Sequence, residues 1–222
     1  MTPRLFLLLV AVTLIAGCAA PEPPPANSPL REVRVDWLGQ QSYRITSALG
    51  TSIITNPYIG AYPANQRPDI VLITTERSDC NNIDAFDNTP TVFRGAVGIG
   101  TNNAAGLRIR GIPTYKNPEQ ETPASMNLVF VWTLDGIRFC FLGHLANELT
   151  SSQVIQIGAV DVLFAPSDAA GAAAVRQLQP RVIIPLGRET FVPRVYRLPG
   201  SSVLLTRETL PAEQTALVFQ RP

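Results

Sequence analysis

Histidine, lysine and cysteine are scarce in this sequence. Its 222 residues include a single histidine, His144, and a single lysine, Lys116, with cysteines only at Cys18, Cys80 and Cys140. Histidine supplies most metal ligands and most general acid–base groups in proteins. A site built from several histidines is therefore excluded.

The sequence also lacks an excess of charge of either sign. Eighteen basic and seventeen acidic residues give a formal charge of +1. Binding to a nucleic-acid backbone relies on a basic surface, so this balance argues against a nucleic-acid partner. With 45% hydrophobic and 16% charged residues, the chain has the composition of one globular domain and not of a disordered polymer.

The N-terminus has the pattern of an export signal. Arg4 precedes an apolar run over residues 5–15, which is too short to span a membrane as a stable helix. The tetrapeptide that ends in Cys18 resembles the bacterial lipobox, which predicts a lipoprotein signal peptide over residues 1–17 and lipidation of Cys18. A simple cleaved signal peptide is the alternative.

Residues 18–32 are rich in proline and poor in residues that build a core. Such a segment favours an extended polyproline II tether. Acyl chains on Cys18 would hold the mature protein on a membrane without crossing it. We therefore expect a protein lipid-anchored in the cell envelope, at the periplasmic face of the outer membrane in a Gram-negative organism, with its folded domain over residues 33–222.

The domain begins with closely spaced β-rich runs. A continuous apolar run at residues 69–74 indicates a strand covered on both faces, and Asp135-Gly136 predicts a tight hairpin turn. The other expected strands are residues 33–38, 42–46, 51–55, 91–93, 107–112, 126–134, 137–142, 160–164, 181–185, 202–206 and 215–220.

Helices are expected only late in the chain. They cover residues 151–157, with Thr150 as a cap, and residues 168–178, with Asp168 near the start. The second helix lies between two expected strands, which predicts a parallel pair joined by a crossover. The fold class is therefore α/β.

Three blocks of sequence resemble the metallo-β-lactamase superfamily, specifically its lactonase-like branch related to ascorbate-6-phosphate lactonase. They are residues 37–57, residues 69–80, and the segments between residues 112 and 187. The resemblance covers about residues 33–190 and implies a four-layer αββα sandwich. It also implies the position of a metal site.

Most positions that hold metal ligands in this superfamily carry other residues here. The His-x-His-x-Asp-His motif corresponds to residues 75–80, in which only the aspartate, Asp79, is retained. The other replacements at metal positions are Lys116 for a histidine, His144 for the bridging aspartate and Gly187 for the last histidine. At the end of the first block, Asn56 stands where the branch has the aspartate of an aspartate–proline pair. The charges of Arg77 and Lys116 would oppose a divalent ion.

The resemblance therefore predicts a pseudoenzyme of a metal-dependent hydrolase family, with no cofactor, that serves in binding or assembly. A small anionic ligand or an envelope protein is the expected partner. Arg77, Arg94 and Lys116 would form an anion-binding cluster if the cavity of the family persists, and are otherwise scattered surface charges.

An enzyme remains the alternative function. The resemblance places Asp79, Cys80 and His144 at the former metal centre, where they could hold one zinc ion. Cys80 and His144 could instead form a thiolate–imidazolium pair, with Asp79 or Asp84 orienting the histidine. Either site would make the protein a remodelled hydrolase. Cys80 could also pair with Cys140, and His144 could be a hydrogen-bonded loop residue.

Overall fold

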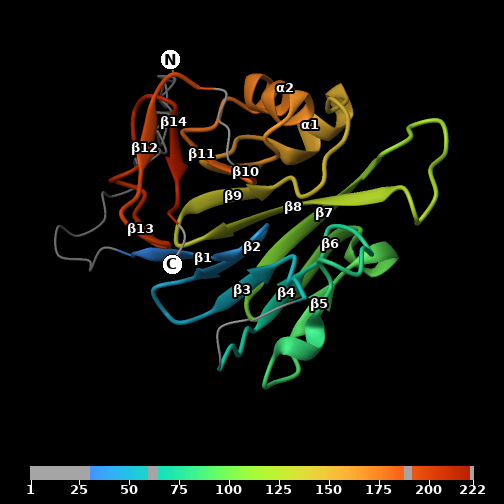
Figure 1. Ribbon diagram of the computed structural model, residues 1–222, viewed down its shortest axis with the longest axis horizontal. Helices are drawn as coiled ribbons and strands as arrows, with labels where there is room; N and C mark the ends of the chain where they lie inside the picture. The colour runs from blue at the N-terminus through green and yellow to red at the C-terminus, as the bar shows by residue number, and fades with distance from the viewer. Residues whose placement is uncertain (1–30, 60–64, 188–191, 221–222) are drawn as a thin grey trace, which may run out of the picture.

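The computed structural model describes residues 31–59, 65–187 and 192–220. The expected signal peptide, Cys18 and most of the tether lie outside these residues and stay predictions. The described residues form two β-sheets, of six and eight strands, with α-helices against one of them (Figure 1).

The six-stranded sheet has the strand order β13-β1-β2-β3-β4-β5. It opens with the antiparallel meander β1, β2 and β3, and continues through the parallel strands β4 and β5. Its strands are β1 (Val33–Gly39), β2 (Ser42–Thr46), β3 (Ser52–Thr55), β4 (Ile70–Leu72), β5 (Thr91–Phe93) and β13 (Ser202–Leu205).

The eight-stranded sheet has the order β12-β14-β11-β10-β9-β8-β7-β6. The neighbours β6, β7, β8 and β9 pair antiparallel, and β9, β10, β11 and β14 pair parallel. Its strands are β6 (Gly100–Ala104), β7 (Leu107–Tyr115), β8 (Met126–Leu134), β9 (Ile137–Phe141), β10 (Val162–Ala165), β11 (Val182–Pro185), β12 (Val195–Arg197) and β14 (Thr215–Val218).

The core between the sheets follows from the alternation of side chains along each strand. On the six-stranded sheet the inner face carries the paired row Val35, Ile45, Ile53 and Ile70. On the eight-stranded sheet it carries the row Phe130, Phe141, Phe164 and Ile184. All eight side chains belong to one buried cluster, so this contact holds the two sheets together.

The opposite face of the eight-stranded sheet packs against α1 (Ser151–Ile157) and α2 (Ala169–Leu178), which lie on the side away from the six-stranded sheet (Figure 1). Val131, Cys140 and Leu163 point toward these helices. Both predicted caps are present. Thr150 and Gln153 form a capping box on α1, and Asp168 accepts a hydrogen bond from Gly171 N in α2.

Most expected elements agree with the structure, and the differences are local. The Asp135-Gly136 hairpin is present, with φ of 48° and 79°. The strand expected at residues 69–74 is hydrogen-bonded as a ladder only over β4, although its buried apolar run continues to Ile73. Strands β6 and β12 were not predicted. Among the described helices, none combines the length and the apolar character that crossing a membrane requires.

Candidate functional site

A cleft of about 1110 Å³ opens where several strands of both sheets end. The β1–β2 hairpin supplies residues 37–41, and the segments after β3, β4, β9 and β11 supply further residues. Its lining includes Asn56, Arg77, Asp79, Cys80, His144 and Gly187. The fold thus brings to one cleft five positions that the resemblance related to the metal site of the family, together with Asn56.

Beneath the cleft, Asn56, Thr74 and His144 form a buried polar network. Asn56 Oδ1 accepts a hydrogen bond from Thr74 N at 2.9 Å, and Asn56 Nδ2 donates to Thr74 Oγ1 at 3.1 Å. The first bond fixes the orientation of the amide, because an N–H cannot face an N–H donor. Thr74 Oγ1 lies 3.4 Å from His144 Nδ1. Asn56 therefore keeps a polar hydrogen bond at its position, without acid–base capacity.

The same hydroxyl faces the ring of His144. Thr74 Oγ1 accepts from Asn56 and retains one hydrogen and one lone pair, so it can either donate to His144 Nδ1 or accept from it. Burial and the nearby Arg77 charge lower the pKa of His144, whereas Asp79 opposes this shift. The net shift favours the neutral form of the ring.

Asn127 on β8 extends the network. Its Oδ1 accepts from His144 N at 2.9 Å, and its Nδ2 donates to Leu142 O and to Thr114 Oγ1, both at 3.0 Å. Gly143 joins these residues with φ of +57°, and a Cβ there would collide with Thr74. The backbone on either side of His144 is therefore fixed by neutral amide and hydroxyl groups.

Arg77 and Asp79 bind each other. Arg77 Nε donates to Asp79 Oδ1 at 2.9 Å and its Nη2 donates to Asp79 Oδ2 at 2.6 Å. These hydrogen bonds from Arg77 lower the pKa of the Asp79 carboxyl. Both carboxylate oxygens thus accept from a guanidinium, in a pair whose two side chains are more than half exposed. Within the described residues, the hydrogen bonds of the Asp79 carboxylate go to Arg77 and not to His144.

Cys80 faces the backbone of its own loop. Its Sγ lies 3.4 Å from Thr75 Oγ1 and 3.6 Å from Arg77 O. Burial raises the pKa of this thiol, an effect that the contact with Thr75 only partly offsets. Cys80 and Cys140 are both free and buried, so the alternative of a disulfide between them is not adopted. Cys140 packs in the apolar layer beneath the helices.

The expected cluster of three cations does not form. Arg77 lines the cleft, whereas Lys116 and Arg94 are not among its lining residues. Arg94 forms an ion pair with Glu76, and Lys116 follows the end of β7 in an exposed position. Asp84, the other suggested partner of His144, also lies outside the cleft lining. The order of the strands in the sheets places Arg94, Lys116 and Asp84 away from the cleft lining. Their positions in the sequence do not reveal this separation.

The residues at the cleft do not fit a dinuclear metal centre. The Asp79 carboxylate binds Arg77, and Nδ1 of His144 faces a hydroxyl. Gly187 has no side chain that could ligate a metal ion, and it lies against Ser167. Within the described ranges, no three His, Cys, Asp or Glu side chains converge in a way that could hold a metal ion. Two metal ions need more nitrogen, oxygen and sulfur donors than this.

Sequence reasoning missed Arg197, which lines the cleft from β12. Arg197 lies opposite Val218 of β14, next to Phe219, and all three residues line the cleft. The motif blocks end before this segment, so no signal in the sequence linked Arg197 to the site.

Comparison with known proteins identifies the family to which this fold belongs. The family described as the beta-lactamase superfamily domain matches residues 34–187, more than half of the chain. The chain belongs to this superfamily. The predicted α/β metallo-β-lactamase fold is therefore confirmed.

A solved structure supports the same fold. A metallo-beta-lactamase superfamily protein from Thermotoga maritima superposes with a TM-score of 0.70 at 23% identity, covering 86% of this chain and 100% of that chain. At this identity the likeness concerns the fold alone.

Two curated relatives are named UPF0173 metal-dependent hydrolases. The one from Cupriavidus necator is 33% identical over an alignment of 94 residues, and the match covers 34% of this chain and 32% of that protein. The one from Cupriavidus taiwanensis is 30% identical over 94 residues, covering 34% and 33%. The match spans about a third of the length of each relative. Metal-dependent hydrolases are thus among the relatives of this metallo-β-lactamase-fold protein.

Proposed function

We propose that this protein is a binding member of the metallo-β-lactamase superfamily in which metal-dependent hydrolysis has been lost. The observation that carries the proposal is the bidentate Arg77–Asp79 pair, which places a guanidinium on the retained aspartate of the metal motif. The network of Asn56, Thr74 and His144 supports it, because Asn56 and Nδ1 of His144 are engaged with Thr74 and not directed at a metal ion.

The proposal includes a place in the cell. The lipobox-like sequence before Cys18 supports a lipid anchor, and the proline-rich residues 18–32 support a tether that presents the domain at a membrane. The blocks at residues 37–57 and 112–187 support an origin in the lactonase-like branch. The protein would then bind a small anion or an envelope protein at the membrane surface.

A hydrolase with a remodelled site is the second candidate. It is favoured by the curated relatives, which are named metal-dependent hydrolases. It is also favoured by the cleft, which still contains Asp79, Cys80 and His144. Such an enzyme would hold one metal ion after Asp79 separates from Arg77, or would use the Cys80 thiol.

Elemental analysis and hydrolysis assays separate the two candidates. Full-length protein should be purified in detergent without a histidine tag, analysed for zinc, iron and manganese, and assayed on lactone, ester and phosphodiester substrates with added zinc or manganese. The binding proposal predicts substoichiometric metal and no turnover. Zinc-dependent turnover that is lost in Asp79→Ala and kept in the exposed control Asp87→Ala would establish the hydrolase instead.

The thiol version of the hydrolase has its own test. Burial raises the pKa of Cys80, and a thiol reacts through its thiolate. We expect native, reduced protein to react slowly with a maleimide at neutral pH, and both buried thiols to react after denaturation. Rapid labelling of Cys80 that slows in His144→Ala would support a Cys–His nucleophile.

A further inference from the structure

The cleft has an aromatic wall. Trp37, Tyr43, Tyr58 and Phe219 all line it. Trp37 Nε1 donates to Gln40 O and Tyr58 OH donates to Leu38 O, so these two rings are fixed against the β1–β2 hairpin. Tyr43 and Phe219 are in contact, with ring centroids 5.8 Å apart. Flat ligands bury area against such rigid aromatic surfaces at little conformational cost.

The charges of the cleft leave one cation in excess. Its charged lining residues are Arg77, Asp79 and Arg197. Arg77 and Asp79 neutralise each other. Arg197 is exposed at the end of β12, and no hydrogen bond or ion pair to it occurs within the described residues. An unpaired guanidinium in a concave site is suited to a carboxylate or a phosphate.

His144 adds a second hydrogen-bond donor that suits an oxyanion. When Thr74 Oγ1 donates to Nδ1, the imidazole carries its proton on Nε2. His144 lines the same cleft as Arg197. The cleft therefore offers a guanidinium and an imidazole N–H, both donors, beside an apolar aromatic wall.

We propose that the cleft binds a small aromatic oxyanion, with Arg197 as its charged partner, His144 as an N–H donor through Nε2, and Trp37 and Phe219 against its ring. This inference rests on the proposed binding function and names the chemical class of the ligand. Carboxylates and phosphate monoesters share the required oxyanion, and the experiment distinguishes them.

Binding of defined probes tests the inference. Full-length protein in detergent is titrated with benzoate and with phenyl phosphate, with neutral benzamide and ring-free inorganic phosphate as comparison probes. Isothermal calorimetry gives the affinity and tryptophan fluorescence reports on Trp37, with Trp37→Phe identifying the source of the signal. We expect saturable binding of at least one aromatic oxyanion, at least about tenfold tighter than that of either comparison probe.

Arg197→Gln should weaken binding of the aromatic oxyanion by about tenfold or more. Arg108→Gln, at an exposed arginine on β7 away from the cleft lining, should leave it unchanged. The preferred probe assigns the oxyanion as carboxylate or phosphate. Absence of saturable binding by both aromatic probes, equal binding of benzamide, or binding that Arg197→Gln does not weaken would overturn the inference.

Failure of this inference and failure of the proposed function are distinguishable. Zinc-dependent turnover in the hydrolysis assays would reject the loss of catalysis, whatever Arg197→Gln does to probe binding. Metal-free, inactive protein that binds none of the probes would leave the loss of hydrolysis standing and reject the aromatic oxyanion.

Discussion

At the scale of single residues, Thr74 is the central member of the network beneath the cleft. It contacts Asn56 through its backbone N–H and its hydroxyl, and its hydroxyl faces His144.

Thr74→Val keeps the shape of the side chain but leaves the Asn56 amide without its acceptor. We expect a loss of about 1 to 3 kcal/mol of unfolding free energy in urea denaturation. The exposed control Thr133→Val on β8 should change it little, and equal stability of both variants would argue against the network.

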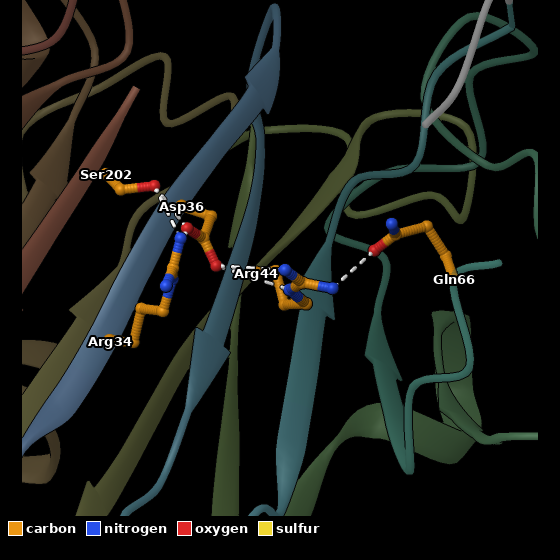
Figure 2. A network of polar contacts seen from close by, with 5 residues as sticks. All are labelled: Arg34, Asp36, Arg44, Gln66 and Ser202. Atoms are coloured by element: carbon orange, nitrogen blue, oxygen red, sulfur yellow. Dashed lines mark hydrogen bonds and ion pairs between the residues drawn. The ribbon is translucent and has the colours of Figure 1, made fainter. Parts of the chain in front are cut away.

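Asp36 is a buried charge on the outer face of the six-stranded sheet (Figure 2). It is bound by Ser202 of β13, by Arg34 of its own strand and by Arg44 of β2, and Arg44 in turn donates to Gln66. This ionic network therefore joins three adjacent strands and the segment before β4.

The Asp36 network predicts a pH dependence of stability. Burial alone would raise the pKa of Asp36, but the hydrogen bonds from Ser202 and Arg34 and the charge of Arg44 lower it overall. A lowered pKa in the folded state stabilises the protein above the pKa of the unfolded chain, and this stabilisation is lost as the pH falls through the folded-state pKa.

Asp36→Asn should therefore cost about 1 to 3 kcal/mol at neutral pH, and the deficit should shrink in strong acid. Urea denaturation from neutral pH down to about pH 3 measures it. The exposed Asp84→Asn serves as the control. A deficit that stays constant across this range would show that the charge of Asp36 is not the cause.

At the scale of elements, α2 shows where tertiary contact overrides helix propensity. Alanine is normally the better helix former than glycine by about 1 kcal/mol. A Cβ on Gly171, however, would collide with the backbone of Pro166. We expect Gly171→Ala to lower the melting temperature, because neither backbone segment can yield without moving α2 from β10. Ala172→Gly should cost only about 1 kcal/mol through propensity, and a stabilised Gly171→Ala would contradict this packing.

The sequence predicted elements well where the signals are local. Thr150, Asp168 and Asp135-Gly136 act on neighbouring residues in the chain, so their effects are readable without a fold. Strands β6 and β12 lack an apolar alternation. They form because their backbones pair with β7 and β14, respectively. No local sequence pattern encodes this pairing.

At the scale of the whole molecule, aromatic packing joins the two sheets. Phe164 of β10 contacts Tyr43 of β2 and Phe141 of β9, with ring centroids 4.9 Å and 5.4 Å apart. Phe164→Ala should cost about 3 to 5 kcal/mol, and both sheets should still unfold in one transition, because their inner faces form one cluster.

Far-ultraviolet circular dichroism and tryptophan fluorescence during urea unfolding check this cooperativity. Leu49→Ala, at a position 85% exposed, is the control. Two separated transitions in the parent protein would mean that the sheets are independent units.

The sequence by itself determined the alternation that builds the strands, the caps and hairpin turn that bound them, and, through the family resemblance, the replacement of most metal ligands. These features depend on residue type and near neighbours. Only the tertiary structure decided that Asp79 binds Arg77, that Thr74 faces His144, that Lys116 lies outside the cleft and that Arg197 enters it. Such pairings join segments far apart in the chain or depend on the path of a loop, so they follow from strand order and close packing.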